Sequence, residues 1–113
     1  MRLNAESAWL MTHSVATKAM IPAGGGKVIN VTLSPHTGMP GIAHSTASRA
    51  AVASLTRVLA IEWARFGIAI NPLAAGYFAT ETFMTKDPRS VVEEAASTVP
   101  LQRPGRHEER ART

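Results

Sequence analysis

Ser45 and Arg49 are the two polar side chains whose spacing most readily suggests chemistry. They are four residues apart in a stretch expected to be helical, so their side chains share one face of its first turn. A serine hydroxyl is a poor acid. An arginine guanidinium cannot be deprotonated in a protein, although it can donate hydrogen bonds and place a positive charge. The pair therefore suits hydrogen-bond donation better than proton relay.

Two histidines flank the loop before this helix. His36 and His44 could each supply a proton, because an unperturbed imidazole titrates near about pH 6.5. Lone histidines are more commonly surface residues. No carboxylate cluster accompanies them, so the sequence predicts no metal site. Tyr77, the only tyrosine, is expected to form a pocket wall and not to act as an acid.

Residues 44–67 are expected to form one long helix. Gly67 suits a left-handed closing residue, and Ser45 or Thr46 could cap the N-terminus. The apolar residues recur at three- and four-residue steps, which places them on one buried face: Val52, Leu55, Leu59, Trp63 and Phe66.

The flanking segments predict an α/β fold. Residues 4–20 suit a helix with Ala8, Met11, Val15 and Ala19 on one face. Residues 27–33 and 68–74 are typical of strands buried between two helix layers, although Pro72 is awkward in the second. The glycine triplet at 24–26 precedes a strand, so it predicts a plain turn and not a phosphate loop. Residues 34–43 are expected to form a loop and residues 90–97 a short helix.

This order of elements predicts a partial Rossmann-like, doubly wound fold. Two buried strands joined by a long helix imply parallel strands with a right-handed crossover.

Length and composition set further bounds. The 113 residues suffice for one small domain, and the absence of cysteine excludes disulfides. No apolar run is long enough for a membrane span, and a cytoplasmic protein is expected. The net charge of +4 is scattered except in the arginine-rich end, so nucleic acid is not the expected partner.

Four stretches, in this order and spacing, resemble the second half of the short-chain dehydrogenase/reductase family. They are GGGKVINVTLS, the segment GMPGIAHSTASRAAVASLTRVLAIEWARFGIAIN, AAGYFATE and VPLQRPGR. The resemblance implies an NAD- or NADP-dependent oxidoreductase with a dinucleotide-binding fold. It assigns residues 1–106 to the C-terminal half of that domain and residues 107–113 to an irregular basic tail.

The resemblance also implies roles for individual residues. Ser45 stands where the family has its tyrosine acid, and Arg49 where it has the lysine that holds the cofactor ribose. The remaining matches are Asn4 in the preceding helix, Thr32 or Ser34 at the catalytic serine, and Gly76 and Thr80 in the cofactor segment, where Ala75 replaces the usual proline.

Within the family, the His-Ser and Ser-Arg pairs and the Glu-Trp-Ala run look most similar to trans-2-enoyl-CoA and 2,4-dienoyl-CoA reductases. Loss of the tyrosine weakens carbonyl reduction. Reduction of a double bond conjugated to a thioester suffers less, since the charge develops on the thioester oxygen and the α-carbon can take its proton from water. An acyl-CoA is therefore the expected small-molecule substrate.

The family's glycine-rich dinucleotide-binding half has no counterpart in this sequence. The chain alone is expected to bind no dinucleotide and to be inactive. By resemblance, the helices at residues 5–20 and 45–66 imply a homo-oligomer. Two alternatives remain open: a non-catalytic module that associates with full-length reductase subunits, and a nucleic-acid binder acting through the arginine tail.

Overall fold

A computed structural model describes residues 2–33, 42–76, 78, 97, 99–106 and 108–109. The chain divides into two compact units, Met1–Ala75 and Gly76–Thr113. Three expected features lie outside the described residues: the loop at 34–41, most of the helix at 90–97 and the histidine at position 36. The division of the chain at residue 106 stays a prediction.

The first unit starts with a helical rod that confirms the helix expected at residues 4–20. It consists of the π-helical turn η1 (Arg2–Glu6), the α-helix α1 (Ser7–Val15) and a second π-helical turn, η2 (Ala16–Met20). The wider π spacing is visible at the C-terminal end, where the Ile21 amide donates to the Ala16 carbonyl at 2.9 Å.

The face traced by Ala8, Met11, Val15 and Ala19 is not the buried face of this rod. Met11 is 67% exposed and Val15 is 40% exposed, whereas Thr12 and Ala16 are buried. Small side chains let a helix approach its neighbours closely, which fits the burial of Thr12 and Ala16 on this rod.

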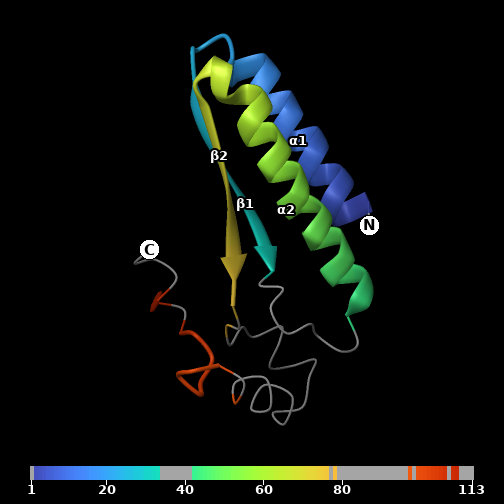
Figure 1. Cartoon of the computed structure of the whole chain (residues 1–113), viewed down its shortest axis with the longest axis vertical. Coiled ribbons are helices and arrows are strands. Elements are labelled where there is room, and N and C mark those ends of the chain that lie inside the picture. The colour runs from blue at the N-terminus through green and yellow to red at the C-terminus, as the bar shows by residue number, and fades with distance from the viewer. Residues whose placement is uncertain are drawn as a thin grey trace. The chain divides into compact units, whose positions relative to one another are not determined.

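The predicted parallel strand pair is confirmed. β1 (Gly26–Leu33) pairs with β2 (Ile68–Ala75), with Gly26 opposite Ile68 and Leu33 opposite Ala75. Pro72 lies opposite Asn30, and β2 tolerates it because β1 is its only partner strand within the described residues. α1 and α2 lie side by side along the sheet (Figure 1).

The expectation that both strand faces are buried is wrong for the described residues. Burial alternates along β1, and Ile68 and Ile70 of β2 are buried on the side that joins the core. The outer face exposes Ile29 (68%), Val31 (55%) and Leu73 (50%). α1 and α2 thus supply one helix layer, and no described element covers the other face.

α2 (Ala43–Trp63) carries most of the core and confirms the long helix. Its buried stripe includes Val52, Leu59 and Trp63, with Leu55 and Phe66 packed partly against the core. The predicted cap is wrong: Ile42 occupies the N-cap position, and its carbonyl accepts from the amides of Ser45 and Thr46. Both hydroxyls therefore lie too far into the helix to cap it.

The end of α2 confirms Gly67 as the closing residue. After the short 3₁₀ turn η3 (Ala64–Phe66), Gly67 has φ 71° in the left-handed region. The turn before β1 passes close to it, since the Gly26 amide donates to the Gly67 carbonyl at 3.3 Å. This contact joins the starts of the two strands.

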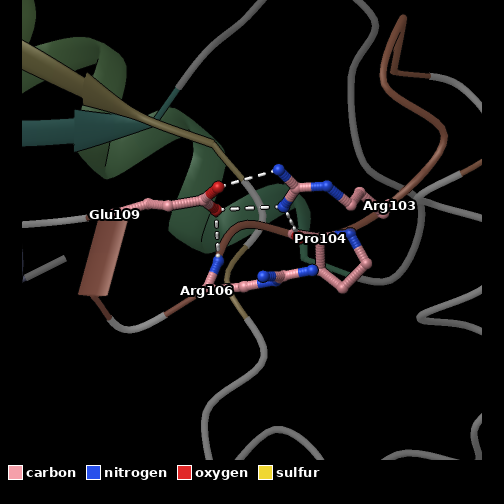
Figure 2. Close-up of polar contacts among 4 residues, drawn as sticks. All are labelled: Arg103, Pro104, Arg106 and Glu109. Atoms are coloured by element: carbon pink, nitrogen blue, oxygen red, sulfur yellow. Dashed lines mark hydrogen bonds and ion pairs between the residues drawn. The ribbon is translucent and has the colours of Figure 1, made fainter.

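The described part of the second unit contains a parallel bridge between Phe78 and Gly105 and a polar cluster. Both terminal guanidinium nitrogens of Arg103, Nη1 and Nη2, donate to the Glu109 carboxylate, at 3.0 and 2.7 Å, and the Arg106 backbone amide donates to it at 2.7 Å (Figure 2). These donors lower the pKa of Glu109 to about 2, with the Arg103 hydrogen bond as the largest cause. The same bond raises the pKa of Arg103.

Candidate functional site

The candidate site lies where α2 begins. β1 and β2 point the same way, and α2 starts at the side of the sheet toward which both arrowheads point (Figure 1). In open parallel α/β sheets, ligands bind outside the carboxyl ends of the strands. The turn that carries Ser45 and Arg49 is therefore at the edge of the sheet that commonly holds a ligand.

A pocket of about 290 Å³ lies among η1, α1, β1 and α2. Its polar lining residues are Asn4, Ser7, Asn30 and Arg49. Its apolar lining residues are Leu3, Ala8, Met11, Val31 and Val52. One cationic side chain among amides and a hydroxyl, on an otherwise apolar wall, could orient a ligand that carries an anionic or hydrogen-bonding group.

Asn4 and Arg49 are brought together in this pocket, although they come from two different helical elements, η1 and α2. Arg49 is half-buried, and the structure gives its guanidinium no hydrogen bond or ion pair within the described residues. Asn4 is also half-buried, and its amide nitrogen donates to the Ser48 hydroxyl at 3.0 Å. The amide of Asn4 thus contacts α2 next to Arg49.

Ser45 is half-buried one turn before Arg49, and its carbonyl accepts the Ser48 hydroxyl at 2.9 Å. It is not among the lining residues of the pocket. Thr32, which is 3% exposed, donates its hydroxyl to the Leu73 carbonyl at 3.4 Å, across the strand pair. It too does not line the pocket. The structure therefore does not join Thr32 to Asn4 and Arg49.

The cofactor-segment residues fall at or beyond the end of the first unit. Gly76 is exposed and directly follows the last residue of β2. Ser34 and Thr80 lie outside the described residues. His44 is exposed at the start of α2. Their suggested roles stay predictions.

The glycine triplet forms the plain turn that its position predicted. The amide of Gly24 donates to Ile21, that of Gly25 to Met20 and that of Gly26 to Gly67. With all three N–H groups satisfied by backbone carbonyls, this turn offers no donor to a phosphate.

Sequence reasoning missed the buried polar residues of the first unit. Ser48 and Thr56 are 1% and 0% exposed, and they continue the buried stripe of α2. Asn30, in the middle of β1, donates to the Thr56 hydroxyl at 2.9 Å. The sequence did contain signals for these residues. Ser48 and Thr56 carry hydroxyls at helical spacing from Val52, and Asn30 places an amide inside an apolar strand.

Within the described residues, no group of three or more histidine or acidic side chains could hold a metal ion. No described helix has both the length and the apolar character that a membrane span requires.

Comparison with known proteins decides the family. A sequence model described as enoyl-(acyl carrier protein) reductase matches residues 1–113. The chain belongs to the short-chain dehydrogenase/reductase family.

Several relatives support this membership. Gluconate 5-dehydrogenase of Gluconobacter oxydans is 43% identical over 82 residues, which cover 72% of this chain and 32% of the relative. A 3-oxoacyl-[acyl-carrier-protein] reductase of Synechocystis is 35% identical over 98% of this chain and 43% of the relative. The chain thus spans between about a third and under half of these reductases.

A solved dehydrogenase structure shows the same fold. The gluconate 5-dehydrogenase of Burkholderia cenocepacia, in complex with NADP and tartrate, superposes with a TM-score of 0.83 at 34% identity. The match covers 94% of this chain and 42% of that protein. The Rossmann-like α/β arrangement predicted from the sequence is therefore confirmed.

Proposed function

We propose that this chain forms the substrate-side wall of an NAD(P)-dependent oxidoreductase. The observation that carries the proposal is the pocket beside the start of α2, which Asn4 and Arg49 line together. Family membership supports a nicotinamide cofactor, and the parallel strands end at the edge where such ligands bind.

The residues present fit one part of such a cofactor. Arg49 offers guanidinium donors without a described partner, which suits the ribose hydroxyls. The glycine turn does not suit the pyrophosphate, because its amides are already satisfied. A bound nicotinamide cofactor would supply the hydride. The phosphate-binding part would have to come from elsewhere than the described residues.

The favoured reaction is reduction of an enoyl or dienoyl thioester such as an acyl-CoA. In this reaction negative charge develops on the thioester oxygen, and a donor placed there lowers the barrier. We assign this donor role to Arg49, supported by the Ser45 hydroxyl. Neither side chain needs to give up a proton, because the α-carbon can be protonated by water.

A second candidate is the oxidoreduction of a keto or hydroxy acid. Its support is the 43% identity to gluconate 5-dehydrogenase, together with a guanidinium that could pair with a substrate carboxylate. Proton transfer to a ketone oxygen would then need a donor other than Ser45.

A chimera can distinguish the two candidates. This chain would replace the matching segment of the Gluconobacter oxydans gluconate 5-dehydrogenase, and NADPH consumption would be followed with crotonyl-CoA and with 5-keto-D-gluconate. We expect turnover of the thioester and loss of ketone reduction. The opposite preference would contradict the enoyl-reductase assignment. Restoring tyrosine with Ser45→Tyr should bring back ketone reduction, and its failure would contradict the argument from proton supply.

The chain on its own is proposed to bind no dinucleotide. Titration with NADPH, followed by nicotinamide fluorescence, should show no saturable change, and clear binding would contradict this. The alternative of an interaction module predicts that the chain co-purifies with an intact reductase. Salt-sensitive binding to DNA or RNA would instead support the arginine tail as a nucleic-acid contact.

A further inference from the structure

Ser48 sits at the centre of a buried polar linkage. Its hydroxyl oxygen accepts from Asn4 Nδ2 at 3.0 Å, and the same hydroxyl donates to the Ser45 carbonyl at 2.9 Å. A serine hydroxyl has one proton to donate, and the bond to the Ser45 carbonyl uses that proton. The linkage ties η1 to the turn of α2 that carries Ser45 and Arg49.

Thr56 repeats the arrangement about two turns further along α2. Its hydroxyl oxygen accepts from Asn30 Nδ2 at 2.9 Å and donates to the Val52 carbonyl at 2.8 Å. Asn30 belongs to β1, so this second linkage ties α2 to the sheet. In both cases an asparagine amide from another element reaches a buried hydroxyl that is bonded back to its own helix.

These two linkages do something that apolar packing alone does poorly. Hydrophobic contact is non-directional, so a helix that packs through small and aliphatic side chains can slide or rotate at modest cost. A hydrogen bond between buried groups is directional, and leaving its partners unpaired is costly. Two such bonds, on different neighbouring elements, fix both the axial position and the rotation of α2.

We propose that Ser48 and Thr56 are positioning residues that hold α2 in the register at which Arg49 lines the pocket. This proposal rests on the proposed function, because that function is what gives Arg49 its role in the pocket. Asn4 then acts through the Ser48 hydroxyl and not by touching the guanidinium. Both hydroxyls orient the helix and take no part in proton transfer.

Amide hydrogen exchange on the intact chain tests the Ser48 linkage. Ser48→Ala and Asn4→Ala should each speed exchange in the first two turns of α2 by roughly fivefold, the value of one modest hydrogen bond. The double variant should exchange no faster than either single one, because the linkage can be lost only once. Ser54→Ala, which makes the same change at an exposed position of α2, should have no effect.

A second readout separates positioning from general stability. The side-chain Nε–H signal of Arg49 in ¹⁵N NMR should shift in Ser48→Ala, because the guanidinium moves relative to the pocket. Ile70→Val, a buried change in β2 that lowers stability by a similar amount, should leave that signal in place. Equal shifts in both variants, or none in Ser48→Ala, would overturn the proposal.

Additive exchange rates in the double variant would also overturn it. If Ser48→Ala does not fold, Asn4→Ala removes the same bond from a half-buried position and gives the same two readouts. Neither readout uses cofactor or turnover, so a failure of NADPH chemistry would leave this test intact.

Discussion

Asn30 and Thr56 form the one side-chain hydrogen bond between β1 and α2 in the part of the chain that the structure describes, 2.9 Å from amide nitrogen to hydroxyl oxygen. Thr56 is 0% exposed, so bulk solvent does not reach its hydroxyl. The bond crosses from the sheet to the helix layer. It is therefore a sensitive place at which to measure what a single polar contact contributes to this fold.

Thr56→Val keeps the shape of the side chain and removes this bond. We expect the free energy of unfolding to fall by about 1–3 kcal/mol, because the Asn30 amide loses its partner. Urea denaturation followed by circular dichroism would measure it. Thr17→Val, at an exposed position of η2, is the matched control and should stay within about 0.5 kcal/mol. An equal loss in both variants would contradict the special role of Thr56.

Leu59→Ala tests the apolar centre of the core. Leu59 is 2% exposed and packs with Ala16, Trp63 and Ile68. Truncation should cost about 2–5 kcal/mol, because it removes buried methyl groups and leaves a cavity. Ile29→Ala, on the outer sheet face with 68% exposure, should cost far less in the same denaturation experiment. A larger loss of stability in Ile29→Ala than in Leu59→Ala would mean that the outer sheet face is covered in solution.

Much of this fold could be predicted because its signals are local. The stripe through Val52, Leu59 and Trp63 and the stop at Gly67 depend only on spacing along the chain, and both were confirmed. The buried face of the rod formed by η1, α1 and η2 could not be predicted in this way. Burial of Thr12 and Ala16, with Met11 exposed, depends on how the rod packs against its neighbours and not on spacing along the chain.

The candidate site was predictable only in part for the same reason. Sequence spacing placed Ser45 and Arg49 on one turn, but only the packing of η1 against α2 brings Asn4 to Ser48. The strand pattern predicted burial on both faces, since Ile29 and Val31 are as apolar as Val28. The apolar composition of a strand does not indicate whether a second helix layer covers the outer face of the sheet.

Gly67→Ala tests the left-handed closing turn of α2. Gly67 has φ 71°, and an added Cβ would lie 2.9 Å from the Gly24 carbonyl oxygen. Backbone strain and this contact should together lower the free energy of unfolding by at least about 1–2 kcal/mol. Gly76→Ala is the control, because its Cβ would meet nothing within 4 Å. Equal stability of the two variants would show that the turn can relax.

The helix surface offers a test of the predicted self-association. α1 exposes Leu10 (57%) and Met11 (67%), and α2 exposes Val58 (49%) and Ile61 (81%). If the chain associates through these helices, Ile61→Glu should weaken the complex by roughly tenfold or more, because it places a charge in an apolar contact. Sedimentation velocity over a concentration series would measure it. Ile29→Lys probes the outer sheet face, and a larger effect there would place the interface on the sheet.

The pairing of Glu109 with Arg103 and the Arg106 amide gives a prediction about pH. The pKa of Glu109 is lowered from 4.5 to about 2, so the carboxylate is held in its charged form. A depressed folded-state pKa means that the stabilising contribution is fully present above about pH 4.5. It is lost as the pH falls toward 2.

Carboxyl ¹³C NMR should show this low titration midpoint for Glu109, and Arg103→Gln should move the midpoint upward, because the largest cause of the pKa shift is then removed. An unchanged midpoint in Arg103→Gln would mean that the two side chains do not pair in solution. Both partners are well exposed, so added salt should also raise the midpoint by screening the pair.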